Sequence, residues 1–186
     1  KRDKFEEAKN AYCSALEKDP EHTDAYVNLG LLLWKNEEYE QSVQAIESAL
    51  KLAPESARAH RILGLVYKEI ETLSRAEDCF LRAIEIDPFC DDALNDLAGI
   101  CLNRREFEKA RMYYKKAVEA NPENSIAYSN YLYSLNYVPD LSNQDILQEH
   151  RKWEANFAYP EQYVFKPDNY DADKILRVGF VSPDFS

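Results

Sequence analysis

Glycine and methionine are scarce in this chain of 186 residues, which contains four glycines and one methionine. A charged, tyrosine-rich sequence with so little glycine favours helices over a β-sandwich, whose tight turns use glycine heavily. Long apolar runs are also missing, so the sequence offers neither a membrane-spanning segment nor the apolar core of a signal peptide. The chain starts at Lys1 in the middle of its pattern, so we expect a natural N-terminus to lie further upstream.

Positive charge is in deficit. The chain has 34 acidic and 23 basic residues, which gives a formal net charge of −11. No basic stripe offsets this excess, because the longest basic runs are pairs such as Arg104–Arg105 and Lys115–Lys116. Nucleic-acid binders depend on clustered cations that neutralise phosphates. We therefore predict neither a nucleic-acid partner nor a membrane partner.

The four cysteines show no spacing that is typical of a disulfide framework or a zinc site. No CxxC pair is present, and no cysteine stands at zinc-ligand spacing from one of the three histidines. Cys13, Cys79 and Cys101 fall on apolar positions of predicted helices, where a thiol behaves as a small hydrophobic group. We therefore expect buried, reduced thiols, no bound metal, and an intracellular, cytoplasmic location, with the nucleus also open to a eukaryotic protein.

A period of 34 residues runs through most of the sequence. It is marked by prolines and by alanines five residues before and five residues after each proline: Pro20, Pro54, Pro88 and Pro122; Ala15, Ala49, Ala83 and Ala117; Ala25, Ala59, Ala93 and Ala127. The best copy reads His60, Leu63, Gly64, Tyr67, Ala76, Phe80, Ala83 and Pro88. This pattern resembles the tetratricopeptide repeat, in which His60 stands where the family has tryptophan.

The spacing predicts an all-α tetratricopeptide superhelix, or α-α solenoid. Small residues let paired helices approach, large residues fill the space between them, and proline ends each pair. Residues 1–137 are interpreted as a half repeat, three full repeats and the first helix of a further one. The predicted helices are Lys4–Lys18, Asp24–Lys35, Glu38–Leu52, Arg58–Glu71, Ser74–Ile86, Asp92–Arg104, Phe107–Ala120 and Ile126–Tyr137.

The first helices of the pairs are predicted to line the inner face of the superhelix. At the position before Leu-Gly they carry a ladder, Asn28, Ile62, Asp96 and Asn130, which is broken at Ile62 and altered at Asp96. Side-chain amides in such a ladder can hydrogen-bond the backbone of an extended peptide. The predicted peptide-binding residues are Asn28, Asp96, Asn130, Trp34, Arg61 and Asn95, with Asp24, Arg58, Asp92 and Tyr133 as neighbours. The alternative is that these residues are merely solvated surface.

One binding mode is disfavoured. Repeats that grip the C-terminal carboxylate of a chaperone resemble one another in placing Lys and Asn one helical turn apart, followed by further cations. The corresponding positions here are Val27 and Leu31, followed by Asp92 and Asp96. A pair of aspartates repels a carboxylate, so we do not expect this clamp.

The 34-residue period ends after Tyr137, and residues 138–158 are predicted to form a capping helix. Ser142 and Asp145 make an N-terminal cap for a helix over Asn143–Ala158. Its apolar face is expected to pack on the array, with His150 packed and hydrogen-bonded and Trp153 as a core anchor. Residues 159–174 are predicted to be a linker loop. Residues 175–186 then give a strand, Ile175–Ser182, and a turn.

The segments SNYLYSLNYVPDLSNQDILQEHRKW and LRVGFVSPDF carry a second resemblance. Together with the repeats, they resemble the tetratricopeptide-containing protein O-GlcNAc transferases and the related SPINDLY-type O-fucosyltransferases. The resemblance implies that residues 175–186 begin a truncated α/β catalytic domain of the GT-B type. It implies a parent enzyme that moves GlcNAc from UDP-GlcNAc, or fucose from GDP-fucose, to Ser/Thr of proteins, with inversion and without metal.

In that family the repeats bind protein substrates and adjoin their own catalytic domain, and self-association through the repeats is a further expectation. The resemblance places the catalytic residues beyond Ser186, so none is assigned here. These 186 residues alone are then expected to be inactive. Two alternatives stay open: a SPINDLY-like O-fucosyltransferase, and a non-enzymatic scaffold for protein interactions.

Overall fold

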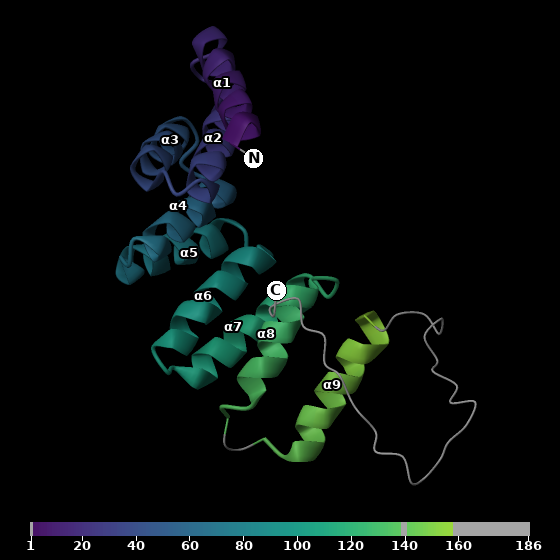
Figure 1. Cartoon of the computed structure of the whole chain (residues 1–186). Helices are drawn as coiled ribbons and strands as arrows, with labels where there is room; N and C mark the ends of the chain where they lie inside the picture. Colours follow the sequence, from purple (N-terminus) through teal and green to yellow (C-terminus); the bar gives the residue numbers. More distant parts are fainter. Residues whose placement is uncertain (1, 139–140, 158–186) are drawn as a thin grey trace, which may run out of the picture.

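The computed structural model describes residues 2–138 and 141–157. Within these ranges the chain forms nine α-helices and no strand, and Figure 1 shows the helices stacked along the chain from α1 to α9. The helices are α1 (Arg2–Lys18), α2 (Thr23–Lys35), α3 (Tyr39–Leu52), α4 (Ala57–Glu69), α5 (Leu73–Ile86), α6 (Asp91–Asn103), α7 (Phe107–Ala120), α8 (Ser125–Leu135) and α9 (Asn143–Phe157).

The pairs α2/α3, α4/α5 and α6/α7 are the three full repeats, with α1 before them and α8 after them. The predicted ends of the helices agree with the observed ends to within two residues. The expectation of an all-α repeat stack is therefore confirmed for the described residues. The predicted linker loop, residues 159–174, and the predicted strand Ile175–Ser182 with its turn lie outside the described residues.

Close approach within each pair depends on small residues. A Cβ added to Gly30 would lie 2.3 Å from Cδ1 of Ile46, and one added to Gly64 would lie 2.6 Å from Cε1 of Phe80. The hydroxyl of Ser42, which is fully buried, donates a 2.7 Å hydrogen bond to the carbonyl oxygen of Gly30. Large side chains thus fill the space that the missing Cβ atoms leave open.

The turn inside each pair uses a left-handed residue that is not glycine. Glu37, Glu71 and Arg105 stand 34 residues apart and have φ values of 63°, 58° and 61°. In each turn the following backbone N–H bonds a carbonyl near the end of the preceding helix, for example Thr72 to Tyr67 at 2.8 Å. This arrangement is a Schellman-type helix end, which usually has glycine at the left-handed position.

The last described helix, α9, begins at the predicted cap. The Ser142 hydroxyl donates to Oδ2 of Asp145 at 2.6 Å, and the Asp145 N–H donates back to Oγ of Ser142 at 3.2 Å. Trp153 is half-buried and packs against the core cluster at the C-terminal end of the described array, as predicted. His150 is exposed, so the expectation that it is packed and hydrogen-bonded is wrong. The reason is that His150 lines the cleft between α8 and α9, where the two helices do not pack closely and the side chain stays exposed.

The cysteines are all free, and their exposure differs from the prediction at one position. Cys101 is buried, and Cys79 is partly buried, as expected of small hydrophobic groups. Cys13 is exposed, so the expectation that it is buried is wrong. Cys13 lines the cleft that α1 shares with α2 and α3, and its side chain is exposed there rather than packed in the core.

Candidate functional site

At two of the three junctions between neighbouring repeats, the first helices lie closer to one another than the second helices do. Helix α2 contacts α4 and α6 contacts α8, whereas no contact of similar extent joins α3, α5 and α7 in the described structure. A stack of pairs with this arrangement curves toward its first helices. We therefore use "inner face" for the face made by α2, α4, α6 and α8 (Figure 1).

The structure joins the predicted ladder residues in pairs across neighbouring repeats. Nη2 of Arg58 donates to Oδ1 of Asn28 at 2.6 Å, which links α4 to α2. Nδ2 of Asn130 donates to Oδ1 of Asn95 at 2.8 Å, which links α8 to α6. The side chains of the ladder therefore link neighbouring repeats.

A cluster of four charges occupies the middle of the inner face. Arg61 bonds both Asp92, at 3.0 Å, and Asp96, at 3.2 Å, and Lys68 lies 3.7 Å from Asp96. The Asp96 side chain is only 12% exposed. Burial raises the pKa of Asp96, although Arg61 and Lys68 act in the opposite direction. Two cations and two carboxylates are thus matched here, so this part of the face carries little net charge.

Two predicted positions pack against the core of the array. Ile62, the predicted break in the ladder, is 1% exposed and packs with Val27 and Leu63. Trp34 is half-buried and packs against the cluster that contains Leu65 and Phe80. Trp34 is therefore not brought together with the ladder amides.

The C-terminal part of the inner face opens into a cleft between α8 and α9. This cleft measures about 370 Å³ and is lined by Ser129, Leu132, Tyr133, Asn136, His150 and Trp153. Tyr133 is 55% exposed. Its ring meets that of Tyr137 edge-on at 5.3 Å, and Tyr137 in turn stacks on Phe107 at 5.1 Å.

Sequence reasoning named Tyr133 but missed the cleft around it. The sequence did contain one signal, because the 34-residue period ends after Tyr137. A helix that follows the end of the period is not expected to pack on α8 as the second helix of a repeat would. Ser129 lies one turn before Tyr133 on α8, and Asn136 directly follows the end of that helix, but only the position of α9 shows that they line a cavity.

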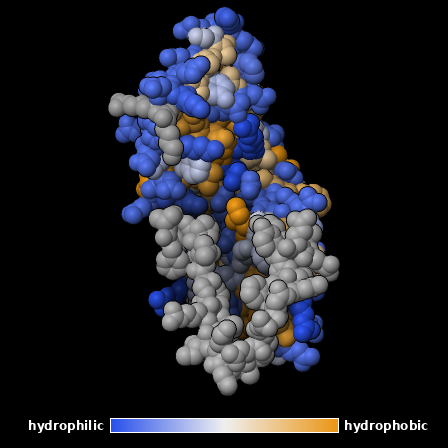
Figure 2. All heavy atoms as spheres, turned by 45° about the vertical axis from the view of Figure 1, so that its right-hand side comes forward, coloured by the Kyte–Doolittle hydropathy of each residue, from blue (hydrophilic) through white to orange (hydrophobic). Residues whose placement is uncertain are grey.

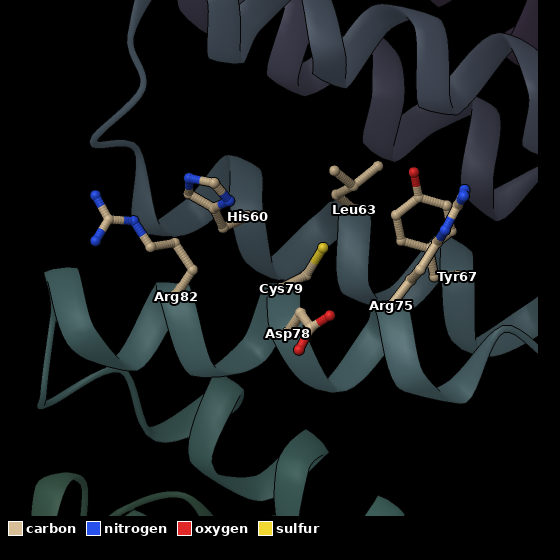
Figure 3. A pocket seen from close by; sticks show the side chains of 7 residues that line it. All are labelled: His60, Leu63, Tyr67, Arg75, Asp78, Cys79 and Arg82. Atoms are coloured by element: carbon tan, nitrogen blue, oxygen red, sulfur yellow. The ribbon is translucent and has the colours of Figure 1, made fainter.

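A second cleft, of about 360 Å³, lies between α4 and α5 (Figure 3). It is lined by His60, Leu63, Tyr67, Arg75, Asp78, Cys79 and Arg82. His60 lies within hydrogen-bonding distance of the Pro54 carbonyl oxygen, at 2.9 Å. Burial raises the pKa of Cys79 to about 11, so its thiol stays protonated at neutral pH and is a poor nucleophile.

The α4/α5 cleft has a counterpart one repeat earlier, between α2 and α3. Its lining residues include those that stand 34 positions before the α4/α5 set: Tyr26, Leu29, Leu33, Gln41, Gln44, Ala45 and Ser48. Ala45 and Cys79 are small, whereas the next repeat has Tyr113 at this position. These two clefts are therefore a product of repeat geometry and small side chains, and their lining does not indicate catalysis.

Among residues 2–138 and 141–157, no three His, Cys, Asp or Glu side chains come together in a way that could hold a metal ion. None of the described helices has both the length and the apolar composition needed to cross a membrane. In the view of Figure 2, apolar residues appear in small patches among hydrophilic ones.

Comparison with known proteins places the repeats in a family and gives one partial relative. The profile described as "Tetratricopeptide repeat" matches residues 1–42, 27–89 and 71–125. A SPINDLY protein of Oryza sativa subsp. japonica, named as a probable UDP-N-acetylglucosamine–peptide N-acetylglucosaminyltransferase, is 35% identical over 74 residues. That match covers 39% of this chain and 8% of the SPINDLY protein, so the chain spans under a tenth of this relative.

Solved structures share the fold at lower identity. MamA superposes with a TM-score of 0.68 at 22% identity, over 83% of this chain and 90% of MamA. YrrB, described as a tetratricopeptide protein with an unusual peptide-binding site, superposes with a TM-score of 0.60 at 22% identity. The YrrB match covers 83% of this chain and 78% of YrrB. At these identities the likeness concerns the fold alone.

Proposed function

This chain belongs to the tetratricopeptide repeat family, and from that membership we propose that its inner face binds an extended segment of a partner protein. The chain then acts as an interaction module, and the first helices of the repeats supply the contact surface. The description of YrrB as a peptide-binding protein with this fold supports the proposal.

The observation that carries the proposal is the Asn95–Asn130 pair on the inner face. Each carboxamide has two N–H donors and an oxygen that accepts two bonds, and the observed contact uses one donor of Asn130 and one acceptor site of Asn95. The unused groups can bond a peptide backbone, while the contact between the two residues keeps their orientation fixed. Backbone bonds of this kind read the extended shape of a segment more than its sequence.

The test is a selection of binding peptides, because the natural partner is unidentified. Random 12-residue peptides displayed on phage are selected on the immobilised chain, and the enriched peptides are made synthetically for titration. The double variant Asn95→Ala/Asn130→Ala is expected to weaken them at least about tenfold. The matched control is Gln41→Ala/Gln44→Ala on the α2/α3 cleft, which is expected to leave binding unchanged. Peptides that tolerate loss of both asparagines but not of both glutamines would refute an inner-face site.

A second candidate function for the parent protein is O-glycosyl transfer, with this chain as the part that binds protein substrates. The partial identity to the SPINDLY protein favours it. The parent would use UDP-GlcNAc, or GDP-fucose in the SPINDLY-like alternative, to modify Ser/Thr without metal. The test is incubation of the full-length parent with each labelled donor and a protein extract, in the presence of a metal chelator. Transfer from either donor supports this function, and failure with both leaves the interaction module.

A further inference from the structure

We infer that the cleft between α8 and α9 binds one uncharged aromatic side chain, phenylalanine or tyrosine, of the segment that lies along the inner face. This inference rests on the proposed function and names the chemistry of the partner at one position. It is drawn from the lining of the cleft, its continuity with the inner face, and an unpaired donor on α9.

The lining of the cleft suits a ring and disfavours a charge. Tyr133 and Trp153 supply aromatic surfaces, and Leu132 adds an aliphatic one. Among the described residues, no Asp, Glu, Lys or Arg lines the cleft, in contrast to the Arg61 cluster in the middle of the inner face. A charged side chain placed here would lose hydration without gaining a partner of opposite charge. An aromatic ring would bury apolar surface and meet other rings edge-on or stacked.

The size of the cleft agrees with this occupant. A volume of about 370 Å³ is at the lower end of the range for small-ligand pockets, roughly 300–1,000 Å³. It is large enough for one ring, and Ser129, Asn136 and His150 add polar groups to its lining that can meet a tyrosine hydroxyl or the peptide backbone.

The cleft lies beside the part of the inner face that carries Asn95 and Asn130. Tyr133 lies one helical turn after Asn130 on α8, and Gly99 occupies the same repeat position on α6. A Cβ added to Gly99 would meet only the Tyr114 hydroxyl, at 3.7 Å. The two preceding repeats have leucine at this position, Leu31 and Leu65. A peptide backbone bonded to the Asn95–Asn130 pair can therefore pass Gly99 and place its next side chains at the cleft.

Helix α9 supplies one wall of the cleft and a donor that has no partner among the described residues. In the described part of the chain, the hydrogen bonds and ion pairs of α9 stay within the helix and its cap, so apolar contacts alone hold α9 on α8. Nε1 of Trp153 is buried and has no acceptor among the described residues. A buried donor without a partner is costly, so a ligand carbonyl or hydroxyl that reached it would be favoured.

The first measurement uses the peptides selected on the chain and compares two tryptophan substitutions. Ser129→Trp places a large ring in the cleft, whereas Glu154→Trp adds the same ring on an exposed part of α9 that does not line the cleft. Selected peptides are expected to be enriched in Phe or Tyr at one position. We expect binding to weaken at least about tenfold when that peptide residue is replaced by Ala or Asp, and also when the chain carries Ser129→Trp. The control Glu154→Trp is expected to leave binding unchanged.

The second measurement does not depend on filling the cleft. The chain has two tryptophans, so Trp34→Phe leaves Trp153 as the single emitter. Titration with a selected aromatic peptide is expected to shift Trp153 emission saturably, with the same midpoint as binding. The Ala-substituted peptide at the same concentrations is expected to leave the emission unchanged.

The outcomes separate the cleft from the inner face. One outcome is that the selected peptides require Asn95 and Asn130 but carry no aromatic residue, tolerate Ser129→Trp and leave Trp153 emission unchanged. This outcome would overturn the inference about the cleft and leave the proposed function standing. Peptides that tolerate loss of both asparagines would overturn the proposed function and, with it, this inference.

Discussion

Gly64 of α4 lies directly against the ring of Phe80 of α5, so close that a Cβ at position 64 would fall 2.6 Å from Cε1 of the ring. The same relationship recurs one repeat earlier between Gly30 and Ile46. These contacts set how closely the helices of a pair approach, and the separation of the helices in turn sets the geometry of the inner face.

Gly64→Ala is expected to destabilise the fold because the added Cβ would clash with the ring of Phe80, which is fully buried. Overpacking of this kind costs roughly 1–3 kcal/mol, from which a helix-propensity gain of up to about 1 kcal/mol is subtracted. The measurement is the midpoint of urea unfolding followed by circular dichroism. Gly99→Ala is the control: its Cβ meets only ordinary contact, so this variant is expected to be as stable as the wild type or more stable.

Glu71→Gly is expected to stabilise the array, because Glu71 adopts φ of 58° in the turn between α4 and α5. Left-handed backbone costs a non-glycine residue roughly 1–2 kcal/mol, part of which is offset by the greater entropy of glycine in the unfolded chain. A net gain of about 0.5–1 kcal/mol is expected in thermal or urea unfolding. The same change at Glu47, which is exposed in the middle of α3, is expected to destabilise by about as much. If Glu71→Gly and Glu47→Gly lowered the stability equally, the left-handed backbone at Glu71 would not be a source of strain.

Asp96→Asn tests the buried carboxylate in the charge cluster. Because burial raises the folded-state pKa of Asp96, the folded chain binds its proton more tightly than the unfolded chain does. The stability that Asp96 contributes by binding this proton is therefore fully present below the pKa of Asp96 in the unfolded chain. It is lost as the pH rises through the pKa of Asp96 in the folded chain. The measurement is the melting temperature of the wild type and of Asp96→Asn at several pH values above about 3.8, the ordinary pKa of an aspartate. On acidification the wild type is expected to gain stability relative to the variant. The reverse trend would mean that Arg61 and Lys68 outweigh burial.

Brief alkylation with iodoacetamide at neutral pH tests the cysteine environments. Cys13 is exposed, Cys101 is buried, and burial holds the pKa of Cys79 at about 11. Since the thiolate is the reacting form, Cys13 is expected to be modified at least about tenfold faster than Cys79 or Cys101. Peptide mapping by mass spectrometry measures each site. Equal alkylation rates at Cys13 and Cys79 in the native chain would contradict the packing of α5. In the control, unfolding in urea is expected to remove the difference in rate between the two cysteines.

The sequence alone determined the helices and their pairing, because the 34-residue spacing of proline, alanine and large apolar residues records which side chains must meet inside a pair. Local chemistry also placed the cap at Ser142 and Asp145. The left-handed turns at Glu37, Glu71 and Arg105 carried no glycine and so left no signal in the sequence.

Only the tertiary structure decided how the inner-face residues are used. Arg61 and Asp96, like Asn95 and Asn130, stand 35 positions apart and become neighbours only when successive repeats stack. The exposure of His150 and the cleft beside Trp153 likewise depend on the angle at which α9 meets α8. That angle is set by long-range packing of Ile146, Trp153 and Phe157 on the array, and the helical pattern of a single segment does not encode it.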